Sequence, residues 1–143
     1  MGLDNGIMIK IKDTNKLNPN IFKELYFTNY GSREEFLYEI LYWRKCWNIR
    51  DVIMNHLENN NITTCDDCSY DMVMPLNVLE SLITDILPDC YSPTWWKENS
   101  DSIWTFDEIC ANYYRDLIKA IRLVERLRDV DPSAYEIYFY DSY

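Results

Sequence analysis

The chain has 143 residues, of which 48% are hydrophobic and 15% aromatic, and its formal net charge at pH 7 is −10. This length corresponds to a single domain, residues 1–143, and the apolar content is too high for an intrinsically disordered protein. Residues 49–110 carry twelve acidic side chains against two basic ones, which disfavours nonspecific binding of nucleic acid by this segment.

The N-terminal segment has the pattern of a half-buried strand. Residues 6–12 alternate between apolar and more polar side chains, with Ile7, Ile9 and Ile11 on one face. No basic segment followed by an apolar run precedes this strand, and no stretch approaches the roughly eighteen apolar residues of a membrane span. We therefore expect a cytoplasmic protein that makes no membrane contact. Its five cysteines, an odd number, fit reduced thiols.

A long helix is predicted from about Arg33 to Asn59. Ser32 and Glu35 have the spacing of a capping box at its start. Apolar side chains then recur at helical spacing on one face, at Phe36, Ile40, Trp43, Trp47, Met54 and Leu57. On such a helix Arg44 lies at the edge of the apolar stripe, and Lys45 points nearly the opposite way.

Arg50 falls inside this apolar stripe, one turn after Trp47. An arginine in that position needs an acidic partner or an anionic ligand, because a buried and unpaired charge costs roughly 3–5 kcal/mol. Asp4 and Asp141 are candidate partners if the two end strands meet near this helix. The sequence leaves open whether Arg50 pairs within the chain or with a ligand.

The second half of the chain is predicted to contain two helices and a strand. Pro75 can begin a helix that ends before Pro88, with an apolar stripe at Leu76, Leu79, Ile83 and Ile86. Residues 59–71 and 88–104 are predicted as loops. Thr105 and Glu108 form a second capping-box pattern, opening a helix to about Asp129. Residues 134–140 alternate again and predict a closing strand.

The helix predicted after Thr105 has two contrasting faces. Its apolar face is formed by Phe106, Tyr113, Leu117, Ala120 and Val124. The opposite face carries a basic row formed by Arg115, Lys119, Arg122 and Arg126. This row is either a solvated surface or a surface that faces a partner or phosphate groups.

These elements predict an α+β fold. The strands at residues 6–12 and 134–140 should pair antiparallel, and helices must cover them because a two-stranded ribbon alone is marginally stable. We therefore expect a mostly helical single domain with a small antiparallel sheet that pairs the N- and C-terminal strands.

The sequence contains no convincing catalytic or metal-binding motif. Cys65 and Cys68 have the spacing of half a zinc site, but the other cysteines and His56 form no second close pair. His56 is the single histidine, and it lies near the end of a predicted helix, where it can act as a cap. We expect no bound metal, no cofactor and no enzymatic activity.

Short blocks spread over the whole length resemble a group of small, uncharacterised proteins of phages and prophages. They are residues 1–7 (MGLDNGI), 42–47 (YWRKCW), 101–104 (DSIW) and 139–143 (FYDSY). The resemblance implies the cytosol of a bacterial host as the compartment. By analogy with other small phage proteins, it also favours a compact counter-defence protein that sequesters a nucleotide immune signal or blocks a nuclease.

Two functional hypotheses follow. In the first, the protein captures a small anionic, nucleotide-like signal, because tryptophan rings stack on flat ligands and arginine and lysine neutralise phosphate. The candidate ligand-binding residues are Trp43, Arg44, Lys45, Trp47, Arg50, Trp104, Asp4, Asn5, Asp141 and Tyr143.

In the second hypothesis, the protein is an acidic inhibitor that imitates nucleic acid and binds a host defence protein. That acidic surface would use Glu58, Asp66, Asp67, Asp71, Glu80, Asp85 and Asp89. Neither hypothesis involves direct nucleic-acid binding, and both are compatible with a homo-oligomer.

Overall fold

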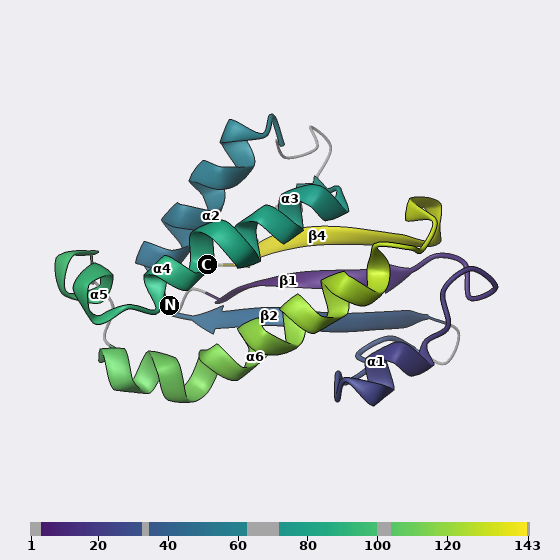
Figure 1. The fold of residues 1–143 in the computed structure, drawn as a ribbon, viewed down its shortest axis with the longest axis horizontal. Helices are drawn as coiled ribbons and strands as arrows, with labels where there is room; N and C mark the ends of the chain where they lie inside the picture. Colours follow the sequence, from purple (N-terminus) through teal and green to yellow (C-terminus); the bar gives the residue numbers. More distant parts are fainter. Residues whose placement is uncertain (1–3, 33–34, 63–71, 100–103, 143) are drawn as a thin grey trace.

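The fold is α+β, with a four-stranded antiparallel sheet in the order β2-β1-β4-β3. A computed structural model describes residues 4–32, 35–62, 72–99 and 104–142. The strands are β1 (Asp4–Ile11), β2 (Phe36–Arg44), β3 (Met72–Met74) and β4 (Tyr135–Ser142). Helices cross one face of this sheet, and the longest of them runs obliquely over β2 and β1 (Figure 1).

The predicted pairing of the first and last strands is confirmed. β1 and β4 are antiparallel neighbours at the centre of the sheet, with Asp4 opposite Ser142 and Ile11 opposite Tyr135. The pairing follows from the alternation in both segments, since the isoleucines of β1 and the odd-numbered residues of β4 point to the same face. Ile7, Ile9 and Phe139 are fully buried there.

Most of the helical elements are short, and the longest of them lies near the C-terminal end of the chain. They are α1 (Asn20–Glu24), α2 (Trp47–Asn59), α3 (Leu76–Ser81), the π-helix η1 (Leu82–Ile86), α4 (Leu87–Cys90), α5 (Pro93–Asn99), α6 (Phe106–Leu127) and the 3-10 helix η2 (Pro132–Ala134). None of the helices in this described part of the chain has the length and apolar character needed to span a bilayer.

The prediction of one helix from Arg33 to Asn59 is wrong. The first part of that segment is β2, which pairs with β1, and the helix α2 begins at Trp47. Between them Lys45 takes a positive φ of 55°, which turns the chain out of the sheet. The segment Phe36–Trp43 is apolar at every position except Glu39, so its pattern does not distinguish a helix from a strand. Several of these residues are aromatic, which favours a strand, and pairing with the buried strand β1 decides the outcome.

The prediction of a loop over residues 88–104 is also wrong. Pro88 is the second residue of α4, directly after the π-helix η1, and it does not end the helical run. Pro93 begins α5. The run from Leu76 to Cys90 continues through the π-helix η1, which widens the turn just before the proline.

The helix α6 agrees with its prediction. Thr105 accepts a hydrogen bond from the Glu108 backbone N–H, and the Glu108 carboxylate accepts one from the Thr105 backbone, which completes the capping box. Tyr113, Leu117 and Ala120 are buried against the sheet and the other helices. The basic row therefore lies on the outward side of α6.

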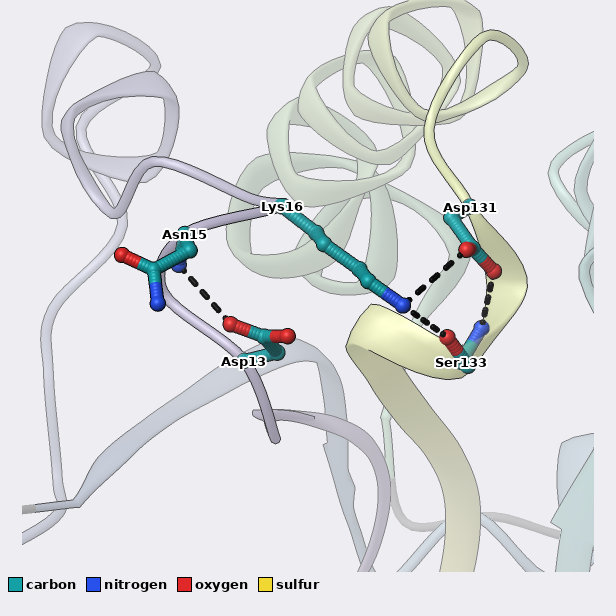
Figure 2. Close-up of polar contacts among 5 residues, drawn as sticks. All are labelled: Asp13, Asn15, Lys16, Asp131 and Ser133. Atoms are coloured by element: carbon teal, nitrogen blue, oxygen red, sulfur yellow. Dashed lines mark hydrogen bonds and ion pairs between the residues drawn. The ribbon is translucent and has the colours of Figure 1, made fainter.

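One exposed contact fastens the loop after β1 to the loop after α6 (Figure 2). The Lys16 ammonium donates to Asp131 Oδ2 at 3.2 Å and to Ser133 Oγ at 3.1 Å. The Ser133 backbone N–H donates to Asp131 Oδ1 at 2.9 Å. These hydrogen bonds to Ser133 and Lys16 lower the pKa of Asp131.

Candidate functional site

Arg50 forms an internal ion pair with the last strand. Its Nη2 and Nε atoms lie 2.6 and 2.7 Å from Asp141 Oδ2. The Arg50 side chain is 18% exposed and that of Asp141 is 7% exposed, so the pair is largely removed from water. Asp51 Oδ1 lies 3.6 Å from Arg50 Nη1 and gives a second, more exposed contact. Of the two partners that the sequence allowed, the structure places Asp141 against Arg50.

The two predicted aspartates lie on opposite faces of the sheet. Asn5 pairs with Asp141 across β1 and β4, whereas Asp4 pairs with Ser142, and neighbouring residues of a strand point to opposite sides. Asp4 accepts a hydrogen bond from the Tyr42 hydroxyl at 2.8 Å. Burial and this hydrogen bond to Asp4 raise the pKa of Tyr42 to about 12. Asp4 therefore does not join Asn5, Asp141 and Arg50 in one site.

Trp43 is a core residue in this structure rather than a stacking platform. Its side chain is 0% exposed, and its indole N–H donates to the Tyr91 hydroxyl at 3.0 Å. Burial raises the pKa of Tyr91. Trp47 is 40% exposed at the start of α2, and the Arg50 guanidinium carbon lies 5.6 Å from the centre of its ring. Trp47 is thus the more accessible of the two tryptophans of this segment.

Three further predicted residues gather near the end of β2. The Trp104 indole N–H donates to the Arg44 carbonyl oxygen at 2.7 Å, and its ring packs edge-on against Tyr113 at 6.5 Å. The Arg44 side chain is exposed, and Lys45 is half-buried in the left-handed turn. These contacts connect α6 to the sheet. The remaining predicted ligand-binding residue, Tyr143, lies outside the described residues, as do Cys65 and Cys68.

A hollow of about 620 Å³ opens beside Arg50, between α2 and α5. Its polar lining includes Asn48, Asp51, Asn55 and Glu58 from α2, and Trp95 and Asn99 come from α5. Arg50, the single cation of this lining, pairs with both Asp141 and Asp51, and Glu58 adds a further carboxylate, so the surroundings of the hollow carry an excess of negative charge. This hollow is therefore unfavourable for a phosphate-bearing ligand.

A second hollow, of about 730 Å³, lies between the C-terminal end of α1 and the outer face of α6. The lining residues are Glu24, Leu25, Tyr26, Arg115, Ile118, Lys119 and Arg122. Residues three, four and seven positions apart share one face of a helix, so Arg115, Lys119 and Arg122 all face this space. The hollow brings three of the four basic-row residues beside an exposed aromatic ring.

Lys119 forms part of the lining of the second hollow and contacts the segment that follows α1. Its ammonium donates to the Tyr26 carbonyl oxygen at 2.8 Å and lies 4.4 Å from the centre of the Phe27 ring. Nearby, Arg126 Nη2 pairs with Glu24 Oε2 at 3.2 Å. Tyr26 takes a positive φ of 65°, and its side chain is 86% exposed. These contacts hold an unusual backbone turn that presents the tyrosine ring to solvent beside α6.

The remaining cations of this hollow are Arg115 and Arg122. Both side chains are exposed, and within the described ranges no carboxylate lies within 4.0 Å of either guanidinium. Asp116, the neighbour of Arg115 in the sequence, has a pKa raised by burial, although Lys119 and Arg115 partly oppose that shift. The hollow therefore carries two arginines that make no ion pair with the described part of the chain.

The sequence identified the basic row but did not identify Tyr26. The spacing of Arg115, Lys119 and Arg122 was visible as a single helical face. The position of Tyr26 depends on a tertiary contact from Lys119 and on a left-handed backbone conformation, neither of which has a short-range pattern. The aromatic content of the Ile21–Tyr30 segment was the one available signal.

No family model matches this sequence, and neither the curated proteins nor the solved structures that were searched contain a match. The candidate site therefore depends on its own geometry. Among the described residues, no group of three or more metal-ligating side chains is close enough to hold a metal ion.

Four acidic residues of the predicted nucleic-acid mimic lie in the described part of the chain, on several different elements. Glu80 pairs with Arg128, and Glu58 lines the hollow beside Arg50. Asp85 and Asp89 are exposed on η1 and α4. The other three, Asp66, Asp67 and Asp71, lie outside the described residues.

Proposed function

We propose that this protein is a non-enzymatic binding protein that captures a small anionic, nucleotide-like ligand. The ligand occupies the hollow between α1 and α6 and not the region around Arg50. The observation that carries the proposal is the presence of Arg115 and Arg122 on either side of Lys119, in the lining of a hollow that also includes the exposed residue Tyr26.

Charge supports this location. The lining contains three basic side chains and one carboxylate, and that carboxylate, Glu24, already pairs with Arg126. Guanidinium groups bind phosphate oxygens through two parallel hydrogen bonds, so Arg115 and Arg122 are suited to separate phosphate groups or to one shared group. In a chain with a net charge of −10, this local excess of positive charge is a favourable place for an anion.

Shape and ring chemistry support a ligand with a planar group. Aromatic stacking on a base contributes about 1–3 kcal/mol and tolerates any base, because every base has a flat face. Tyr26 offers such a ring, and the apolar atoms of Leu25 and Ile118 form part of the floor. A volume of about 730 Å³ is within the range of small-molecule sites.

The resemblance to small phage proteins extends the proposal to a biological role. Capture without turnover would remove a nucleotide immune signal from the host cytosol. A protein that only captures its ligand needs high affinity for it and sufficient abundance, and it needs no general base. A site formed from arginine, lysine and tyrosine meets these requirements.

The test combines identification of the ligand with titration. Small molecules released by heating the purified protein are identified by mass spectrometry, and ATP, AMP and adenosine are titrated by calorimetry. Arg115→Ala with Arg122→Ala should weaken ATP binding by about a hundredfold, about tenfold for each lost contact, with adenosine affected least. The melting temperature should change little, since both side chains are exposed.

A matched control removes the same charge elsewhere. Lys10→Ala with Lys12→Ala also deletes two cations, from the sheet side of the molecule. Equal loss of ATP binding in both double variants would show a general charge effect and contradict the α1–α6 site. No binding of any of the three probes, and no released anion, would contradict the proposed function itself.

A further inference from the structure

The two arginines of the α1–α6 hollow lie about two helical turns apart. Arg115 and Arg122 both line the hollow, both are exposed, and seven positions separate them on α6. An α-helix rises about 1.5 Å per residue, so their Cα atoms are roughly 10 Å apart along the helix axis. Side chains on a helix all lean toward its N-terminus, so two arginines on one face leave the helix in the same direction. Their guanidinium groups therefore reach two separate places in the hollow.

The cation between the two arginines is already engaged. Lys119 lies between Arg115 and Arg122 on the same face of α6, and its ammonium donates to the Tyr26 carbonyl oxygen at 2.8 Å. The same ammonium lies 4.4 Å from the centre of the Phe27 ring. These contacts direct the lysine toward the segment that follows α1. The positive charge offered to an anion is therefore concentrated at the two arginines, at either end of this row.

The lining between the two arginines is more apolar. Ile118 lies between them on α6 and is half-buried, and the half-buried Leu25 lines the α1 side. The carboxylate in this lining, Glu24, pairs with Arg126. A phosphate group placed against the apolar side chains would lose water without gaining a hydrogen-bond donor. An uncharged part of a ligand suits the middle of the hollow better.

We infer that the α1–α6 site takes a nucleotide in which a nucleoside lies between two phosphate groups. Arg115 binds one phosphate, Arg122 binds the other, and the nucleoside lies between them against Ile118. The phosphates of ADP or ATP are joined directly to one another. Both arginines contact them only if the two guanidinium groups come close together, against their mutual repulsion. The inference rests on the proposed function, because it specifies the ligand of the same site.

The experiment compares two isomers. Adenosine 3′,5′-bisphosphate and ADP have the same atoms, the same base and two phosphate groups, and they differ in whether the nucleoside separates those groups. ATP controls for charge, because it carries one phosphate more than ADP in the same joined arrangement. Calorimetry on the wild-type protein should show the bisphosphate binding at least tenfold more tightly than ADP, and more tightly than ATP.

Single-arginine variants assign the contacts. In Arg115→Ala and in Arg122→Ala one guanidinium remains for one phosphate group, so the preference for the bisphosphate over ADP should fall to within about twofold. Lys10→Ala removes a cation of β1, outside the lining, and should keep the full preference. Near-native melting temperatures check that each variant is folded.

A further variant changes the spacing and keeps the number of arginines. Arg115→Ala with Ile118→Arg leaves two arginines four positions apart, or about 6 Å along the helix axis. This closer pair suits joined phosphate groups. The variant should therefore bind ADP at least as tightly as the bisphosphate.

Two results would overturn the inference and leave the proposed function intact. The first is ADP or ATP binding the wild type as tightly as the bisphosphate does, with the affinity of each lowered by loss of either arginine. The second is a full preference for the bisphosphate in the variant with closer arginines. A preference that persists in both single-arginine variants would overturn the inference together with the proposed location. No binding of any of the three probes would overturn the proposed function itself.

Discussion

Arginine and an aromatic residue occur together in two regions of this molecule, and the two regions differ in what the arginine does. Arg50 lies beside Trp47 but is held by Asp141, a carboxylate with a side chain 7% exposed. Arg115 and Arg122 lie on the outer face of α6, beside a hollow that also contains Tyr26. The comparison teaches that an arginine inside an apolar stripe is a poor guide to a ligand site, because the fold itself has a reason to pair it. The exposed arginines around the concave surface of the α1–α6 hollow have no such internal carboxylate among the described residues, and the proposed function depends on them.

The sharpest test of this comparison is Arg50→Ala. The substitution leaves Asp141 buried without its cation, so we expect a loss of about 3 kcal/mol of unfolding free energy. This corresponds to a fall in melting temperature of roughly 10 °C. ATP affinity per folded molecule should stay the same, because Arg50 lies outside the α1–α6 hollow.

A double-mutant cycle with Asp141→Asn separates the pair from other effects of Arg50. The second substitution should cost much less in the Arg50→Ala background than in the wild type. An Arg50→Ala protein with unchanged stability and lost ATP binding would reverse the roles of the two regions.

Lys119→Met gives a smaller effect at the other region. It removes the hydrogen bond to Tyr26 and the contact with the Phe27 ring, for an expected loss of about 1 kcal/mol in stability. ATP binding should weaken severalfold, because the tyrosine turn loses its support. Thermal melts and calorimetry on the same preparation measure both quantities. Lost stability with unchanged ATP affinity would show that Lys119 does not position Tyr26 for binding.

Glu39 extends the comparison to a half-buried carboxylate that forms no ion pair within the described part of the chain. Burial raises its pKa, the charges of Asp116 and Asp4 add to the shift, and the hydrogen bond from Tyr140 opposes it. A raised folded-state pKa means that stability is greatest below the unfolded-state value and falls as the pH rises through the folded-state value. Glu39→Gln should therefore raise the melting temperature at neutral pH and lose this advantage in acid. A lower melting temperature at neutral pH would contradict this account.

The smallest effect is expected at Asp131, which is exposed beside Lys16. Its pKa is lowered, so its contribution is present above the unfolded-state pKa and disappears as the pH falls through the folded-state value. Asp131→Asn should cost little stability at neutral pH, and the difference from the wild type should vanish in strong acid. Melting curves across this acid range measure it. A difference that grows in acid would contradict the assignment.

The sequence was most informative where pattern and burial agree. Ile7, Ile9 and Ile11 predicted β1 and its pairing with β4, and the Thr105–Glu108 box predicted the start of α6. It was misleading over β2, because the segment from Phe36 to Trp43 is apolar at every position except Glu39 and so satisfies helical spacing while showing no clear strand alternation. The partner strand decides that choice, and the partner is distant in the sequence.

The candidate site shows the same limit. Asp141 could be suggested as a partner of Arg50, but Asp4 could be separated from it only once the register of β1 and β4 was known. The basic face of α6 was visible as a spacing of charges. Its aromatic neighbour Tyr26 was not, because it is brought there by a turn 93 residues away from Lys119.

The central position of β1 and β4 has a consequence for how this chain folds. Each of these strands has its long-range neighbour across almost the whole sequence, from Asp4 to Ser142. On a ribosome, β1 emerges before β4 and cannot pair with it until residues 135–142 have been synthesised. The segments of helices α1 to α6 are therefore synthesised before the sheet on which they pack is complete. Contacts between residues so far apart in the sequence slow folding. A chain cut before Tyr135 should leave the β1 edge unpaired and prone to association with other strands.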